Sequence, residues 1–337
     1  MLTMDNRLKD AKNDKAAFEQ LEKYTSVKQI NRLFRFIMPF KFTTLQKLAP
    51  KSMKRSVVDM LNFLNGQDNI ITPEDPRSML LWEDKDIPLY DGVRKPFIVP
   101  MLLENKKAPA VVIAPGGAYI NCCIKDEGFR VAERFNELGF HAIIVNYRVS
   151  PNRYPCPQLD FIRAMQVVRS KAEEWGIIED KITAIGFSAG GHLVTSIPGL
   201  FEELREQTGD LKDINGVPDA LIGGYPMIDL KCQSMGITCD MIFLGDKMTE
   251  ELSRKLSVQN LIDENYPPTF LFAEEGDNTC PPKTNCEVAK KVLDKYNVPN
   301  EMHVYKGDRH GFNLGEGRES GAWVESSIAF LKKYNKA

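Results

Sequence analysis

Short apolar runs recur along the chain from about residue 97 to its end. In the run at 269–273 the apolar residues are continuous, which is typical of a parallel strand buried on both faces. The runs predict strands at Phe97–Leu102, Ala110–Ala114, His141–Tyr147, Ile182–Phe187, Ala220–Tyr225, Thr269–Ala273 and Glu301–Lys306.

Segments with helical character fall between these runs. They are Asp126–Leu138, Gln158–Trp175, the stretch after Gly190, Lys283–Tyr296 and Ala322–Tyr334. Strands that alternate with helices predict an α/β fold, in which a mostly parallel central sheet has helices on both faces. Right-handed crossovers then bring the loops that follow the strands to one edge of the sheet.

Residues 1–75 do not follow this alternation and are interpreted as a helical N-terminal extension, with the catalytic domain at 76–337. Within 24–65, basic residues far outnumber the single acid, Asp59, and aromatic and aliphatic residues are interleaved with them. Three hypotheses fit: a cap over the active site, an arm that forms a homodimer, or an amphipathic helix on a membrane surface. We favour the cap or the dimer arm.

A second insertion is expected at Lys231–Asn260. Its apolar residues either face a substrate pocket or pack as a small satellite core. They are Met235, Met241, Ile242, Phe243 and Leu244.

Composition narrows the class of protein. The 337 residues carry a net charge of −2, which indicates no general attraction to nucleic acid or membranes. The seven cysteines show neither a disulfide framework nor zinc-ligand spacing, so reduced thiols are expected. The N-terminus is polar, and no apolar run reaches the ~18–20 residues of a membrane span. A cytoplasmic protein without a membrane span is predicted.

The run Gly186-Phe187-Ser188-Ala189-Gly190 has the G-x-S-x-G pattern of a nucleophile elbow. It lies between a predicted strand and a predicted helix, the context in which a serine hydroxyl is held above the sheet. The pattern by itself is equally compatible with a glycine-rich turn that carries a capping serine. A histidine and an acid in later loops are needed to decide.

The chain contains four histidines. His141 and His303 lie in strand-like runs, and His192 falls in the first turn after the elbow, so structural roles are expected for these three. His310 lies in a polar loop between Gly307 and Gly311, just after a predicted strand. A loop at the carboxyl end of a strand is where α/β enzymes place their catalytic groups, so His310 is the predicted base.

The acid is expected in the loop that follows 269–273. Glu274 and Glu275 are assigned to the strand end or to solvent, and Asp308 is too close in sequence to reach the far nitrogen of the His310 ring. Asp277 follows the turn at Gly276 and is therefore the predicted acid, which orients the imidazole.

Backbone N–H groups for an oxyanion hole are predicted at two places. One is Ala189, directly after the serine, and the others are Gly117 and Ala118, in the loop after the strand at 110–114. A simple Pro-Gly turn at 115–116 is the alternative.

Taken together, these segments resemble α/β-hydrolase esterases related to acetyl xylan esterases, feruloyl esterases and the hormone-sensitive-lipase group. The resemblance covers roughly residues 80–337 and is carried by PGGAY (115–119), DEGFRVAERFNELGF (126–140), NYRVSP (146–151), YPCPQLD (154–160), GFSAGGH (186–192), EEGDNTCP (274–281) and KGDRHGF (306–312). It implies the α/β-hydrolase fold, a pocket-lining role for Tyr119 and structural roles for Glu127 and Asp160. The chain departs from the family in having Ala118 where a third glycine is frequent, and alanine resists positive φ.

The predicted activity is hydrolysis of short-acyl, acetyl-like esters, including those of carbohydrates, through an acyl-enzyme on a Ser188–His310–Asp277 triad. The partner is a small-molecule ester, and no metal or organic cofactor is expected. Two alternatives stay open. One is an exopeptidase or amidase on the same triad, and the other is a binding protein that keeps the fold without the chemistry.

Overall fold

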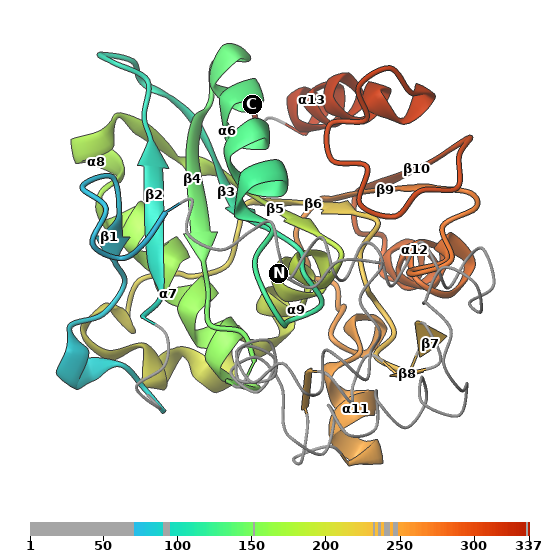
Figure 1. The fold of residues 1–337 in the computed structure, drawn as a ribbon, viewed down its shortest axis with the longest axis horizontal. Helices are drawn as coiled ribbons and strands as arrows, with labels where there is room; N and C mark the ends of the chain where they lie inside the picture. Colours follow the sequence, from blue (N-terminus) through green and yellow to red (C-terminus); the bar gives the residue numbers. More distant parts are fainter. Residues whose placement is uncertain are drawn as a thin grey trace, which may run out of the picture.

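The computed structural model describes residues 71–89, 95–150, 152–231, 233–234, 237–238, 243–244, 249–334 and 336–337. Over these residues the chain forms one large twisted sheet that carries helices on both faces (Figure 1). The predicted α/β class is confirmed, because strands and helices alternate along the chain.

The main sheet has eight strands in the order β1-β2-β4-β3-β5-β6-β9-β10. The β1–β2 and β2–β4 pairs are antiparallel, and every other neighbouring pair is parallel. The strands are β1 (Met79–Leu80), β2 (Phe97–Met101), β3 (Ala108–Ala114), β4 (His141–Asn146), β5 (Ile177–Phe187), β6 (Ala220–Gly224), β9 (Thr269–Glu274) and β10 (Asn300–Tyr305). A separate hairpin pairs β7 (Gln233–Ser234) with β8 (Ile237–Thr238).

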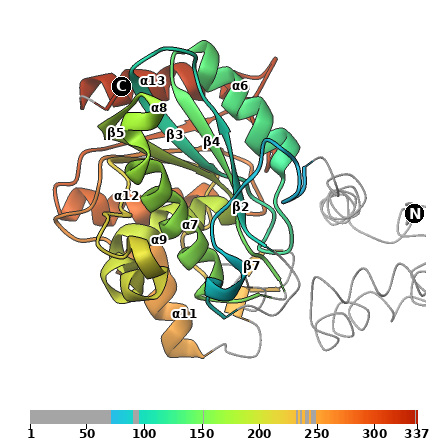
Figure 2. The same ribbon diagram turned by 90° about the vertical axis from the view of Figure 1, so that its left-hand side faces the viewer.

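Helices α6 and α13 cover one face of the sheet, and α7, α9 and α12 cover the other (Figure 2). These helices are α6 (Arg130–Glu137), α7 (Cys156–Ser170), α9 (Ala189–Leu204), α12 (Cys286–Lys295) and α13 (Trp323–Lys333). Two shorter helices are α8 (Ala172–Trp175) and α11 (Glu250–Leu256). An ion pair of 3.1 Å between Arg134 and Glu325 joins α6 to α13.

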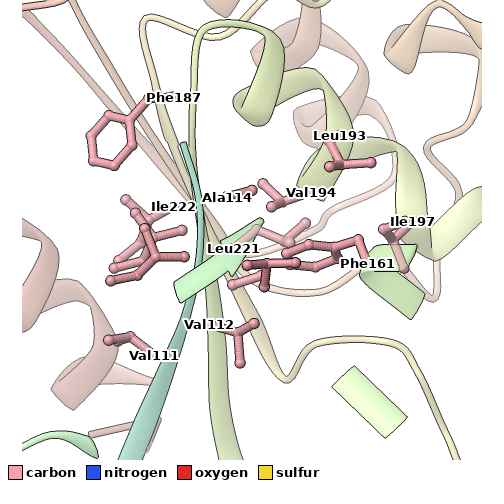
Figure 3. Packing of buried hydrophobic residues seen from close by; sticks show 14 of the residues in the cluster. Val111, Val112, Ala114, Phe161, Phe187, Leu193, Val194, Ile197, Leu221 and Ile222 are labelled. Carbon is pink, nitrogen blue, oxygen red and sulfur yellow. The ribbon is translucent and has the colours of Figure 1, made fainter. Parts of the chain in front are cut away.

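The strands of the sheet centre are buried on both faces, as their continuous apolar character predicts. In β3 the side chains of Val111 and Val112 point to opposite faces, and Val112 lies on the side of Val194 and Phe161 from the helices (Figure 3). Burying an aliphatic side chain of this size stabilises the fold by roughly 1.5–3 kcal/mol. The sheet is thus a rigid platform for the loops at its strand ends.

All seven predicted strands are present, with small differences in their limits. β5 begins at Ile177, five residues before the predicted start, because its first half carries charged, solvent-facing residues that hide the strand. The predicted helix at 126–138 is instead a π-helical turn, Ile124–Phe129, followed by α6. β1, the β7–β8 hairpin and α11 were not predicted, since each is too short to show a period.

The hypotheses on the N-terminal extension concern residues outside the described part of the chain, and the cap, the dimer arm and the membrane-surface helix stay predictions. Ile71, where the description begins, is already buried in the core. In the 231–260 insertion, Met235, Met241 and Ile242 are likewise outside it, whereas Phe243 and Leu244 are buried. A search of the described helices finds none with the length and apolar character needed to cross a membrane.

Candidate active site

Ser188 occupies the sharp turn between β5 and α9. Its backbone has φ 52° and ψ −116°, a conformation that a side chain rarely adopts and that is typical of a nucleophile elbow. A Cβ on Gly190 would lie 2.1 Å from the carbonyl oxygen of Ala114, and one on Gly186 would lie 2.2 Å from that of Gly190. Glycine is therefore required on both sides of the serine, and the half-buried hydroxyl stays open to a ligand.

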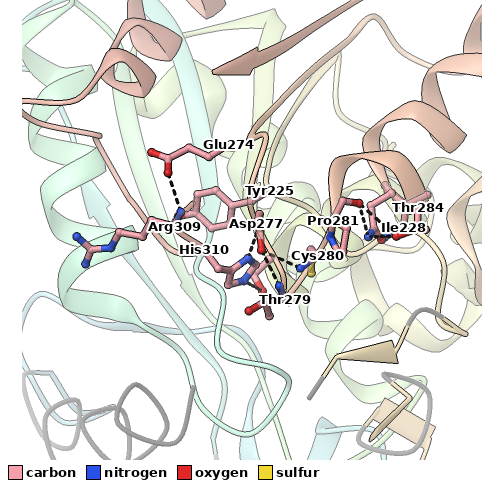
Figure 4. A network of polar contacts seen from close by, with 12 residues as sticks. Tyr225, Ile228, Glu274, Asp277, Thr279, Cys280, Pro281, Thr284, Arg309 and His310 are labelled. Atoms are coloured by element: carbon pink, nitrogen blue, oxygen red, sulfur yellow. Dashed lines mark hydrogen bonds and ion pairs between the residues drawn. The ribbon is translucent and has the colours of Figure 1, made fainter. Parts of the chain in front are cut away.

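The structure brings the three predicted side chains together at the carboxyl edge of the sheet. His310 Nε2 lies 2.8 Å from Ser188 Oγ. On the other side of the ring, His310 Nδ1 lies 2.7 Å from Asp277 Oδ2 (Figure 4). A carboxylate only accepts hydrogen bonds, so Nδ1 carries the proton and Nε2 is left to accept from the serine hydroxyl. This is the arrangement in which a histidine can take a proton from a serine.

Asp277 is fully buried at the start of the loop after β9. Its Oδ1 accepts hydrogen bonds from the N–H groups of Thr279 and Cys280, at 2.8 and 3.0 Å. Burial alone would raise the pKa of Asp277, but His310 and these two N–H groups outweigh burial and hold the pKa below its usual value. The carboxylate is therefore ionised at neutral pH and keeps the His310 ring in one orientation.

Glu274 ends β9 and organises the loop that carries His310. Both of its oxygens accept from the Arg318 guanidinium at 2.8 Å, and they also accept from the Arg309 N–H and the Ser320 hydroxyl at 2.7 Å. Burial raises the pKa of Glu274, and these partners together lower it below the ordinary value. Its place at the strand end is as predicted. The role of Glu274 in holding the His310 loop was not predicted, because its partner Arg318 is 44 residues away in the sequence.

The loop after β3 lies against the elbow. The Gly116 N–H donates to the Glu127 carboxylate at 2.7 Å, and the predicted oxyanion donors Gly117 and Ala118 follow it in the loop. Gly117 and Ala118 have φ of 133° and 54°, so Ala118 adopts the positive φ that alanine resists. The Ala189 N–H, at the first position of α9, has no partner inside the helix.

Tyr119, the next residue of that loop, is buried and cannot bond a ligand through its hydroxyl. The hydroxyl lies 2.7 Å from His192 Nδ1, while His192 Nε2 donates to the Leu256 carbonyl at 2.9 Å. Phe243, from the 231–260 insertion, stacks on the Tyr119 ring with centroids 4.4 Å apart. Burial lowers the pKa of His192 to about 4, so this histidine is neutral and structural, as expected. Tyr119 is thus held in a fixed position by His192 and Phe243, and its predicted role in lining a substrate pocket stays a prediction.

Asp160 lies away from these groups, in a fully buried pair with Arg148 at 2.7 Å. Trp82 Nε1 also donates to this carboxylate, at 3.2 Å, so Asp160 anchors the segment before β2. Over the described ranges, no three His, Cys, Asp or Glu side chains are grouped as ligands for a metal ion.

Tyr225 was not singled out from the sequence, although it directly follows β6. Its ring packs edge-on against His310, with centroids 5.0 Å apart and an angle of 67°. Its position after a strand that adjoins the elbow strand was the available signal, but a tyrosine at a strand end is usual in a buried sheet.

The BD-FAE family model matches the chain over residues 99–292. The matched range is more than half of the chain and includes Ser188 and Asp277, but it ends before His310. Curated relatives include the acetylxylan esterase of Xylanibacter ruminicola, 27% identical over 65% of this chain and 44% of the relative. Esterase LipC of Mycobacterium tuberculosis is 23% identical over 80% of this chain and 65% of the relative. The chain spans 35% to 65% of the length of the first curated relatives it matches.

Among solved structures, the crystal structure of an acetyl ester-xyloside bifunctional hydrolase from Caldicellulosiruptor lactoaceticus superposes with a TM-score of 0.70. It is 29% identical, and the match covers 77% of this chain and 96% of that one. The carboxylesterase Cest-2923 from Lactobacillus plantarum gives a TM-score of 0.63 at 22% identity, over 74% of this chain and 96% of that one. These similarities confirm the predicted α/β-hydrolase fold.

Proposed function

The chain belongs to the BD-FAE family of α/β-hydrolase esterases, and from that membership we propose that it hydrolyses carboxylic esters with Ser188 as the nucleophile. The observation that carries the proposal is the hydrogen-bonded series from Ser188 through His310 to Asp277, at 2.8 and 2.7 Å. The first distance is within the range in which a base takes a proton from a nucleophile, and the second is a hydrogen bond that orients the base.

In the first step Ser188 Oγ attacks the ester carbonyl carbon, and its proton passes to His310 Nε2. The N–H groups of Gly117, Ala118 and Ala189 are the proposed donors to the oxyanion. When the carbon–oxygen bond to the alcohol breaks, the alcohol leaves with the proton from His310. Water then attacks the acyl carbon and gives one proton to His310. When the bond from the acyl carbon to Ser188 Oγ breaks, His310 returns this proton to Oγ, and the carboxylic acid leaves.

We propose a short acyl group as the preferred substrate, and a carbohydrate as one class of alcohol. The support is of two kinds. Two relatives are an acetylxylan esterase and an acetyl ester-xyloside hydrolase by name. In addition, Tyr119 directly follows the proposed oxyanion donors, and its ring is held in place beside them by stacking on Phe243 and by the hydrogen bond to His192.

The proposal is tested by hydrolysis of p-nitrophenyl esters from C2 to C12. Ser188→Ala is compared with wild type and with Ser196→Ala, a buried serine two turns along α9 whose hydroxyl bonds the Leu193 carbonyl. We expect turnover that falls steeply with chain length and is lost only in Ser188→Ala. Equal turnover in wild type and Ser188→Ala would refute the assigned nucleophile.

Two controls separate the alternatives. Acyl p-nitroanilides report an amidase, which would cleave them in preference to the matching esters. A fluorophosphonate probe reports the nucleophile, because a stoichiometric adduct on Ser188 requires an activated serine. A folded chain without an adduct would favour a binding protein with an α/β-hydrolase fold.

A further inference from the structure

Glu127 is a buried carboxylate that the steps proposed above do not use. It lies in the π-helical turn at 124–129, between β3 and α6, and only 4% of its surface is exposed. Burying a charged group without partners is costly, so its contacts indicate what its presence achieves.

One oxygen of Glu127 holds the start of the oxyanion loop. Oε2 accepts the Gly116 N–H at 2.7 Å. The space around Gly116 is tight, because a Cβ there would lie 2.8 Å from this oxygen and 3.0 Å from Ser188 Cβ. The backbone that leads into Gly117 and Ala118 is therefore held between Glu127 and the nucleophile elbow.

The other oxygen reaches the loop that carries His310. Oε1 accepts from the Tyr225 hydroxyl at 2.7 Å, and that hydroxyl oxygen accepts the Asn313 N–H at 3.3 Å. The ring of the same tyrosine packs against His310. One side chain thus connects two loops whose separate positions decide how Ser188, His310 and the oxyanion donors meet.

The protonation states are consistent with this connection. Burial raises the pKa of Tyr225 well above its usual value, so the phenol stays protonated and donates. Burial also raises the pKa of Glu127, while the bonds from Tyr225 and Gly116 oppose that rise because both favour a carboxylate that accepts.

We propose that Glu127 is a positioning residue, which sets the oxyanion loop through the Gly116 N–H and the His310 loop through Tyr225. The inference rests on the proposed ester hydrolysis and assigns it a further residue. Glu127 touches no reacting atom in this scheme. Its loss lowers transition-state stabilisation and leaves ground-state binding of the ester unchanged.

The test compares Glu127→Ala with Glu127→Gln on p-nitrophenyl acetate. We expect kcat of the alanine variant to fall about tenfold to a hundredfold. This loss is no larger than the one that follows direct removal of an oxyanion donor. KM should stay within about threefold, as expected when an interaction of the transition state alone is lost. Glutamine should recover kcat to a value between those of the alanine variant and wild type, because its carbonyl still accepts from the Gly116 N–H, whereas its NH2 group cannot accept the proton that Tyr225 donates.

Asp219→Asn is the matched control. Burial raises the pKa of Asp219, as it does for Glu127, and the Asp219 carboxylate accepts the Ile182 N–H at 2.9 Å. Asp219 lies at the opposite edge of the sheet. We expect its kcat to stay within about twofold of wild type even if its stability falls. The proposal is overturned if kcat of Glu127→Ala stays within about twofold of wild type, or if glutamine is as slow as alanine.

If circular dichroism shows that Glu127→Ala does not fold, Tyr225→Phe decides. Tyr225→Phe keeps the ring against His310 and removes only the hydroxyl, so we expect a severalfold loss of kcat. An unchanged kcat overturns the proposal.

Wild type and Ser188→Ala are measured alongside these variants. If wild type shows no turnover that depends on Ser188, the proposed function fails. In that case, the rate at which a fluorophosphonate labels Ser188 is compared between wild type and the Glu127 variants, which tests the positioning role without an ester substrate.

Discussion

The two edges of the sheet differ in how their loops hold unusual backbone conformations. At the edge beside Ser188, residues with positive φ include Ala118, Ser188 and Tyr225, whose side chains resist it. At the opposite edge, the residues with positive φ include Asn105 and Asn297, just before β3 and β10. Asparagine tolerates this conformation, whereas other side chains lose roughly 1–2 kcal/mol in it.

The difference indicates that the edge with the candidate site depends on distant contacts for its shape. The Ser188 N–H donates to the Gly224 carbonyl at 3.0 Å, and the Tyr119 carbonyl accepts from the Ser150 N–H at 2.8 Å. Strained residues that surrounding structure holds in place cluster at functional sites. At the opposite edge, Asn105 and Asn297 adopt positive φ at a lower cost, because asparagine tolerates this conformation.

The largest expected effect separates the two edges by activity. Asp277→Asn should lower kcat by about 10⁴-fold, because an amide no longer selects the productive tautomer of His310. Asp219→Asn, at the other edge, should leave kcat nearly unchanged. Steady-state kinetics on p-nitrophenyl acetate measure both variants. Comparable losses in the two variants would mean that the edges are not functionally distinct.

The second effect separates the edges by stability. Gly190→Ala should destabilise the fold by about 3 kcal/mol or more, because the new Cβ would meet the Ala114 carbonyl, which the sheet holds rigidly. Gly139→Ala, just before β4, has φ 89° and open space around the Cβ, so only about 1 kcal/mol of backbone strain is expected. Urea unfolding measures both, and equal losses would contradict the comparison.

A third effect is the pH dependence of stability from His192, beneath the elbow. Its pKa is about 4 in the folded chain and 6.5 ordinarily, so between these values only the unfolded chain binds the extra proton. Acidification from pH 6.5 to about 4 should therefore remove about 3 kcal/mol of stability. Urea unfolding at pH 7 and 4.5 should show a smaller loss in His192→Gln. The same loss in both proteins would exclude this histidine as the cause.

The smallest effect concerns substrate choice. Phe243→Leu removes the ring that stacks on Tyr119 and should raise the ratio of hexanoate to acetate turnover severalfold, about 1 kcal/mol of discrimination. Leu331→Met, a buried change in α13, is the control for altered packing alone. An unchanged ratio in Phe243→Leu would exclude this ring from the acyl pocket.

Much of the fold and the candidate triad could be predicted because the signals are local. The seven strands are visible in the sequence as apolar runs. The G-x-S-x-G pattern predicts a tight turn, because the glycines around Ser188 allow one. His310 and Asp277 could be found because each follows a strand of the same sheet, and parallel strands bring such loops to one edge. Their catalytic roles stay predictions, although the structure places them within hydrogen-bond distance.

The roles of Glu127, Tyr225 and Glu274 could not be predicted in the same way. Glu127 and Tyr225 are 98 residues apart, and nothing in the residues around either one indicates the other. From the sequence, Phe243 could either face a substrate pocket or pack in a small satellite core. The two could not be distinguished, because its stacking on Tyr119 depends on the path of an insertion.

The α/β alternation, the elbow at Ser188 and the residues available for a triad could all be inferred from the order of neighbouring residues. Which buried carboxylate holds which loop, and which ring stacks on Tyr119, became visible in the three-dimensional structure. The physical reason is that helix and strand patterns are set by residues a few positions apart. The loops of the candidate site are instead held by hydrogen bonds and packing between residues that only the crossovers of the sheet bring together.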